Sequence, residues 1–171
     1  MASELFSPLS HDTWATLRLI SFLRDMPAEL RAWTAPGTYG SIEQTLGHVI
    51  GSEHYYVYRL TGEAPSVELT PSTTVDLDDL AERIRWCADR LGRLCAKDFD
   101  QNAPTHQNPG DARSPTMGEM VTQLLWHGAE HRAQIATILG AHGVEAPDMS
   151  GWTYAEEHKT AGRAWPVADL S

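Results

Sequence analysis

The sequence contains few cysteines, only Cys87 and Cys95 among 171 residues. They are eight positions apart in a segment predicted to be helical, which separates them by roughly 12 Å along the helix axis. That separation is too large for a disulfide bond. A chain of this length can bury enough apolar surface to be stable without disulfides. We therefore expect two buried or half-buried free thiols, as in a protein of the reducing cytoplasm.

Long hydrophobic runs are also missing. No stretch reaches the roughly 18 consecutive apolar residues that indicate a membrane-spanning helix. The first residues, MASELFSPLSHD, contain no basic patch followed by an apolar stretch, so they do not look like a secretion signal. These absences predict a cytoplasmic protein without a membrane partner.

Basic residues are scarce as well. The sequence has 13 Lys and Arg against 23 Asp and Glu, for a formal net charge of -10. A field of this sign repels phosphate backbones, which argues against nucleic acid as a partner. The sequence also has no Gly-rich phosphate loop, no GxSxG motif and no CxxC motif. We expect a small-molecule substrate instead.

What the sequence does contain is helical periodicity. Apolar residues recur at helical spacing in four long segments, 11–26, 41–62, 76–97 and 117–142, separated by Pro- and Gly-containing connections. Capping-box pairs mark two of the starts, Ser41 with Gln44 and Thr116 with Glu119, and Gly143 is placed to follow the last helix. No segment has a strand pattern. The sequence therefore predicts an all-α fold, an antiparallel or crossover four-helix bundle.

We expect a single domain over residues 1–171. Its bundle core covers about 9–145, and a short C-terminal extension covers 146–171. Within the extension, residues 152–158 are predicted to form a short helix.

Histidine is the unusual residue in the composition. Eight histidines in a chain of this size are about twice the number in an average soluble protein. His127 and His131 stand at positions i and i+4 of the last predicted helix, so both imidazoles lie on one face. Spacing alone is equally compatible with chance, but the same face carries Leu124, Ile135 and Ile138. The two imidazoles should therefore point at a core or a pocket, where a metal ion would give each ring a partner.

A third ligand would have to come from another helix. His48 lies midway along the segment 41–62 and is flanked by Leu46, Val49 and Ile50. The alternative is a core histidine bonded to a backbone carbonyl. His54, six residues further along, should face away from His48 because six residues turn a helix by about 240°.

Two stretches carry a resemblance to a known family. They are LGHVIGSEHYYVYRLTGE, which contains His48, and LLWHGAEHRAQIATILGAHGVEAP, which contains the HxxxHRxQ block. Over roughly residues 9–145 the sequence resembles the DinB-like (DinB/YfiT) metal-binding superfamily. The resemblance implies a four-helix bundle in which His48, His127 and His131 bind one divalent metal ion, often zinc or nickel. Some relatives place Glu at the position of His127, and this chain does not.

Three neutral imidazoles would leave at least one coordination position open, which is the arrangement of catalytic metal sites. The resemblance implies a metal-dependent enzyme in which a low-molecular-weight thiol, mycothiol or bacillithiol, is used for S-transfer or isomerisation of a small electrophile. Two alternatives stay open from the residues: a metal-dependent hydrolase, and a stress-linked module that binds a metal or ligand without turnover. The resemblance also implies a homodimer, and Tyr56 and Tyr58 are candidate interface residues.

Helical spacing also predicts which polar side chains lie near the three histidines. These pocket candidates are Gln44, Tyr55, Gln123 and Gln134. The alternative interpretation of each is a polar side chain at the mouth of the bundle without a functional role.

Overall fold

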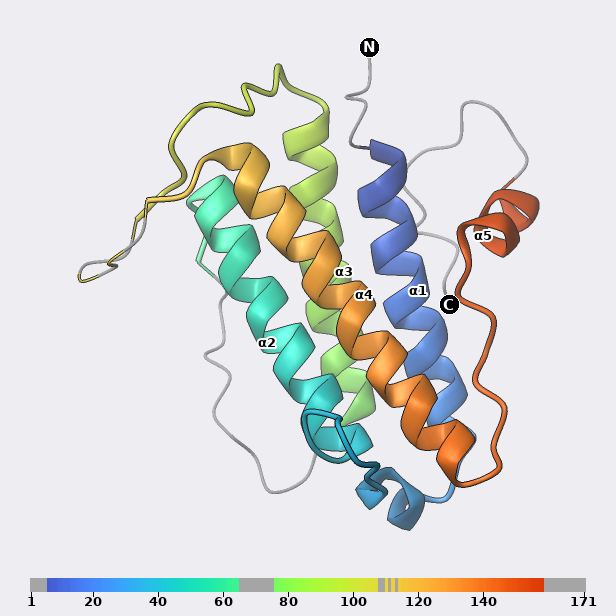
Figure 1. The fold of residues 1–171 in the computed structure, drawn as a ribbon. Helices are drawn as coiled ribbons and strands as arrows, with labels where there is room; N and C mark the ends of the chain where they lie inside the picture. The colour runs from blue at the N-terminus through green and yellow to red at the C-terminus, as the bar shows by residue number, and fades with distance from the viewer. Residues whose placement is uncertain (1–5, 65–75, 108–109, 111, 113, 159–171) are drawn as a thin grey trace.

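The computed structural model describes residues 6–64, 76–107, 110, 112 and 114–158. Over these residues the chain forms one short 3-10 helix and five α-helices (Figure 1), and no strand. The elements are α1 (Phe6–Arg24), η1 (Ala28–Ala32), α2 (Ile42–Thr61), α3 (Leu77–Cys95), α4 (Met117–Ala141) and α5 (Gly151–Glu157). The predicted all-α fold is confirmed.

The four long helices form a bundle of the crossover kind. α1 packs against α3 and α4, and α2 packs against the same two helices, so α1 is diagonal to α2 and α3 is diagonal to α4. In Figure 1, α1 and α4 run downward while α2 and α3 run upward. α2 and α3 follow one another in sequence yet run in the same direction. Of the two predicted arrangements, this excludes the antiparallel bundle, in which each helix runs opposite to the one before it. α2 and α4 are neighbouring antiparallel helices, which places their middles side by side.

The helix starts follow the capping signals in the sequence. Ser41 and Thr116 begin α2 and α4 with complete capping boxes, and the Asp76 side chain accepts hydrogen bonds from the first turn of α3. Gly62 ends α2 with a φ of +76°, a left-handed conformation that favours glycine. The predicted connections between segments 41–62 and 76–97 and between segments 76–97 and 117–142 lie partly outside the described residues, as does the predicted C-terminal extension, which is described only to residue 158.

The predicted start of the first helix, at His11, is wrong. α1 begins at Phe6, so Ser10, the residue directly before the predicted start, is a fully buried residue inside the helix. Pro8 is the third residue of α1, a position whose backbone N–H has no acceptor within the helix. The absence of an N–H at Pro8 therefore costs no helical hydrogen bond. At the other end the helix stops at Arg24, two residues before the predicted end at Met26, because the residue before Pro27 disfavours helical geometry.

The bundle interior is mostly apolar. The buried side chains form two clusters along the bundle axis, one of which includes Leu19, Ile20, Ile50, Ile84 and Ile135, and the other Leu9, Val57, Leu91, Met120 and Leu124. Cys87 and Cys95 are buried free thiols on α3, as predicted. None of the helices in the described part of the chain is long and apolar enough to cross a membrane.

The short helix α5 packs on α1. The indole of Trp14 donates a hydrogen bond to the carboxylate of Glu157 at 3.2 Å, and Arg18 forms an ion pair with the same carboxylate at 2.8 Å. Tyr154 contacts the ring of Trp14 edge to face. The predicted helix at 152–158 is therefore present, starting one residue earlier after the N-cap Ser150.

Candidate metal centre

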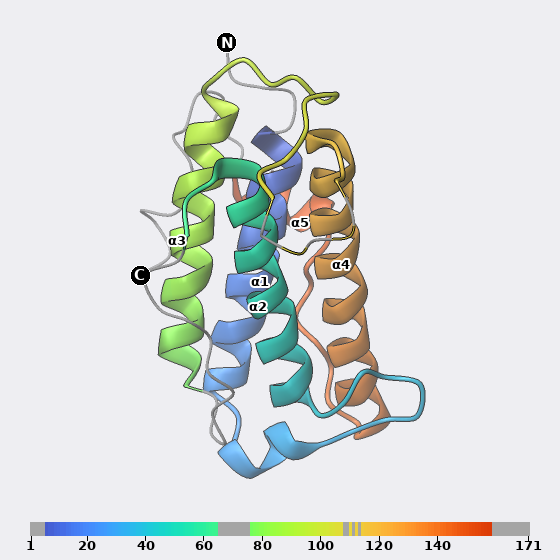
Figure 2. The same cartoon turned by 90° about the vertical axis from the view of Figure 1, so that its left-hand side faces the viewer.

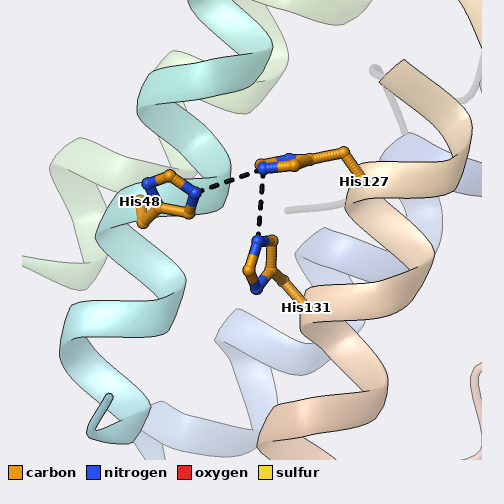
Figure 3. Close-up of side chains that lie close together, drawn as sticks. All are labelled: His48, His127 and His131. Atoms are coloured by element: carbon orange, nitrogen blue, oxygen red, sulfur yellow. Dashed lines mark hydrogen bonds between the residues drawn. The ribbon is translucent and has the colours of Figure 1, made fainter. Parts of the chain in front are cut away.

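Three imidazoles converge between α2 and α4. The Nε2 atom of His127 lies 3.2 Å from Nε2 of His48 and 3.2 Å from Nε2 of His131 (Figure 3). One ligand nitrogen from each of the three rings lies within 4.8 Å of the other two. Four-residue spacing puts His127 and His131 on one face of α4, and the antiparallel packing of α2 puts His48 opposite them. The three side chains named as ligands from the sequence therefore lie together.

Protons alone cannot satisfy the contacts between these rings. A neutral imidazole nitrogen carries either one N–H or one lone pair. His127 Nε2 faces two ring nitrogens, so a single proton or lone pair serves only one of them well. A cation bound by three lone pairs satisfies all three rings at once. Nitrogens bound tetrahedrally to zinc at about 2.0–2.1 Å lie roughly 3.4 Å apart, close to the 3.2 Å found for the two pairs that include His127.

The electrostatics of the cluster favour the neutral form of His48 and His127. Burial, followed by the neighbouring His131 and His48, lowers the pKa of His127 to about 4. Burial and then His131 lower the pKa of His48 below its usual value. Since a histidine binds metal through an unprotonated nitrogen, these shifts leave the lone pairs available at neutral pH.

Two tyrosine rings flank the cluster. Tyr39, in the segment between η1 and α2, stacks on His48 with 4.1 Å between ring centroids and 16° between planes, and it meets His131 edge to face at 5.5 Å. Tyr56 on α2 meets His127 edge to face at 5.6 Å. Sequence reasoning missed Tyr39, because a residue in a Pro- and Gly-containing loop belongs to no helical pattern. Tyr56, a candidate dimer-interface residue in the sequence analysis, has its ring against His127.

One of the four pocket candidates, Gln134, contacts the histidine cluster itself, and Gln123 contacts the flanking Tyr56. The side-chain oxygen of Gln134 lies 3.0 Å from Nδ1 of His131, and the amide of Gln123 donates to the hydroxyl of Tyr56 at 3.3 Å. The other two have different partners. Gln44 completes the capping box at the start of α2, and the hydroxyl of Tyr55 accepts a hydrogen bond from Arg59 at 2.7 Å.

The remaining buried histidine faces another helix. Nε2 of His54 lies 3.2 Å from the backbone carbonyl oxygen of Arg83 on α3, so His54 points away from His48 as helical geometry predicts. His11 lies against Trp14 and Tyr154, at the contact between α1 and α5. These two histidines are not part of the candidate metal centre.

An open surface hollow of about 780 Å³ lies near the start of α4. Its lining includes Gln123 and the exposed Trp126 of α4, together with Gln101 and Asn102. None of the three clustered histidines lines this hollow. It is therefore a separate feature, and the contact between Gln123 and Tyr56 lies between the hollow and the cluster.

Comparison with known proteins finds a family match that spans the helical bundle. The family model of the DinB superfamily matches residues 11–135, which contain all of α2 and α3, most of α1 and α4, and all three clustered histidines. The chain is also similar to the protein DinB of Bacillus subtilis (strain 168), with 23% identity over 152 residues that cover 84% of this chain and 88% of the relative. The family match extends over most of the chain, and the chain therefore belongs to the DinB superfamily.

Proposed function

We propose that this protein is an enzyme that binds one divalent metal ion, zinc or nickel, through His48, His127 and His131, and uses it to activate a low-molecular-weight thiol. The observation that carries the proposal is the convergence of three imidazole nitrogens, 3.2 Å apart in two of the three pairs, on one point between α2 and α4. Membership of the DinB superfamily supports it.

The donor set suits thiol chemistry. A bound divalent cation supplies positive charge that lowers the pKa of a coordinating thiol. The three imidazoles contribute no negative charge of their own, so they leave that charge undiminished. Three protein ligands also leave room for the sulfur of a thiol such as mycothiol or bacillithiol. Tyr39 and Tyr56 cover two sides of the cluster and keep bulk water from those sides.

S-transfer then requires little further from the protein. The thiol proton passes to solvent, the sulfur forms a bond to an electrophilic carbon, and the leaving group departs with its electron pair. No general base is needed once the thiol is deprotonated. Hydrolysis at such a site often uses a carboxylate as a base, as the Glu of the HExxH motif does. The group of metal-competent side chains found among the described residues contains no carboxylate, and Glu130 of this chain is exposed. Thiol transfer is therefore favoured over hydrolysis.

The proposal is tested with purified protein in two steps. Elemental analysis first measures the metal content of the wild type, of His48→Ala and of His142→Ala, a control histidine at the end of α4 that contacts Trp33 instead of the cluster. Each protein is then incubated with mycothiol or bacillithiol and monochlorobimane, and the fluorescent conjugate is followed. We expect about one metal ion per chain and turnover in the wild type and His142→Ala, and neither in His48→Ala. Metal-loaded wild type that is no faster than His48→Ala would overturn the thiol-transferase proposal.

A further inference from the structure

One side-chain oxygen links the candidate metal centre to the loop that covers it. Oε1 of Gln134 lies 3.0 Å from the backbone nitrogen of Tyr39 and 3.0 Å from Nδ1 of His131. Figure 2 shows the segment between η1 and α2 reaching across to α4, which is how a residue of this loop meets a residue of that helix. The two contacts share a single acceptor atom.

The first of these contacts determines the proton arrangement of the second. A backbone N–H can only donate, so the Gln134 atom that faces Tyr39 must be the carbonyl oxygen and not the amide nitrogen. That oxygen can only accept, so Nδ1 of His131 must carry the proton that it receives. In a neutral ring the lone pair then lies on Nε2, the atom that faces His127. Gln134 therefore selects the tautomer of His131 that can bind a metal ion at the cluster.

The ring of the same tyrosine contacts the second ligand. The ring of Tyr39 stacks on His48 with 4.1 Å between ring centroids and 16° between ring planes, and it also meets the ring of His131 edge to face. The Tyr39 side chain is 56% exposed, so burial in the core does not hold it in place. Its loop is closed by a turn at Gly37, with a φ of +82°, and by the hydrogen bond from the backbone N–H of Ile42 to the carbonyl of Trp33 at 3.1 Å. One loop residue thus touches two imidazoles on two different helices.

We propose that Tyr39 and Gln134 are positioning residues for the metal ligands: Tyr39 holds the ring of His48 and the amide of Gln134, and Gln134 sets the tautomer of His131. This inference rests on the metal-binding part of the proposed function and is independent of the thiol chemistry. Partners of the nitrogen that does not bind metal commonly orient metal-binding histidines, and their loss typically lowers metal affinity about 10–100-fold.

The tautomer is measured on metal-free protein. Two-bond proton–nitrogen NMR correlation of ¹⁵N-histidine-labelled protein reports which ring nitrogen carries the proton. We expect His131 to be protonated at Nδ1 in the wild type and in Gln134→Glu, which keeps an acceptor, and to be a mixture of tautomers in Gln134→Leu. Gln123→Leu is the matched control, since Gln123 lies on the same helix and contacts Tyr56 but none of the histidines.

Metal affinity is measured by competition for zinc with a chromophoric chelator. We expect Gln134→Leu to bind zinc about 10–100-fold more weakly, and Gln134→Glu and Gln123→Leu to bind within a few-fold of the wild type. Tyr39→Phe keeps the ring and the backbone N–H, so its affinity should not change. Tyr39→Ala keeps only the N–H, so its affinity should fall while the His131 tautomer is retained.

The inference is overturned if Gln134→Leu, folded by circular dichroism, keeps both the wild-type tautomer and the wild-type affinity. It is also overturned if Gln134→Glu fails to restore the tautomer. If the wild type does not bind zinc, the proposed function is refuted. The tautomer of His131, measured on metal-free protein, would still test the role of Gln134. Zinc affinities as expected but no thiol transfer would refute only the proposed thiol chemistry.

Discussion

The carboxylate of Asp12 on α1 lies 2.6 Å from the guanidinium of Arg132 on α4, and both side chains are almost completely buried. Arg132 also donates to the hydroxyl of Thr16 at 2.9 Å. Because Arg132 directly follows the ligand His131 in sequence, this ion pair fixes the rotation of α4 about its own axis. The face of α4 that carries Arg132 is thus turned toward α1, and the face that carries His127 and His131 is turned toward α2.

Gly128→Ala should disturb this ion pair. A Cβ atom at residue 128 would lie 2.8 Å from Oδ1 of Asp12 and 2.9 Å from Nη1 of Arg132, closer than side chains approach one another. Overpacking costs about 1–3 kcal/mol, and a shift that weakens the buried pair adds to it. Alanine is better than glycine in a helix by only about 1 kcal/mol. We therefore expect a net loss of stability, measured by urea unfolding, together with weaker zinc binding.

Gly140→Ala is the matched control for that substitution. Gly140 lies on the same helix, and nothing lies within 4 Å of the position that its Cβ would occupy. At this position only the higher helix propensity of alanine changes the stability, so Gly140→Ala should be more stable than the wild type by up to about 1 kcal/mol. Equal effects of the two substitutions would show that the contact between α1 and α4 does not require a glycine at residue 128.

Glu53 gives a prediction about pH. Its carboxyl group is buried among the helices with no hydrogen-bond partner for Oε1 among the described residues. Burial, and then the charge of Asp12, raise its pKa from 4.5 to about 8, against the opposing effect of Arg132. The folded protein therefore keeps a proton that the unfolded chain loses between these pH values. Stability from this group is complete below the unfolded pKa and falls as pH rises toward about 8.

Glu53→Gln tests this pH dependence. The wild type should lose up to about 1.4 kcal/mol per pH unit relative to the variant between about pH 5 and pH 8. The measurement is urea unfolding of both proteins across that range, with a chelator present so that metal binding does not contribute. Parallel stability curves would contradict the raised pKa, because glutamine cannot ionise.

The cysteines should be unreactive in the folded protein. Cys87 is fully buried and Cys95 almost so. Burial, and then the charge of Glu53, raise the pKa of the Cys87 thiol, and burial raises that of Cys95. Since the thiolate is the reactive form, Ellman's reagent should label neither residue on the timescale on which it labels free cysteine, and both after unfolding in urea. Rapid labelling of one thiol in native protein would show that α3 opens readily.

How far the sequence could predict these features depends on how many positions apart in the sequence the contacting residues lie. Capping boxes and the spacing of His127 and His131 involve residues three or four positions apart, so the sequence displays them directly. The ion pair between Asp12 and Arg132 joins residues 120 positions apart. The stacking of Tyr39 on His48 depends on the path of a loop. Periodicity contains no information about either contact, because both arise only when the helices pack.

Metal binding should stabilise the fold through the histidine cluster. A ligand that binds only the folded state at 100 times its dissociation constant adds about 2.7 kcal/mol of stability. Zinc at such an excess should therefore raise the melting temperature of the wild type, and a chelator should reverse the rise. His127→Ala should lose the effect, because removing the ring nitrogen that lies 3.2 Å from both neighbours opens the cluster.

Two further variants make that result specific to the cluster. His142→Ala removes an exposed histidine at the end of α4 and should keep the full zinc-induced shift. His127→Glu places a carboxylate where some relatives in the resemblance have one, so it should recover much of the shift that His127→Ala loses, since carboxylate oxygens also bind zinc. If zinc stabilises His127→Ala as much as the wild type, the ion binds elsewhere. If His127→Glu fails where His127→Ala also fails, the site accepts only imidazole at residue 127.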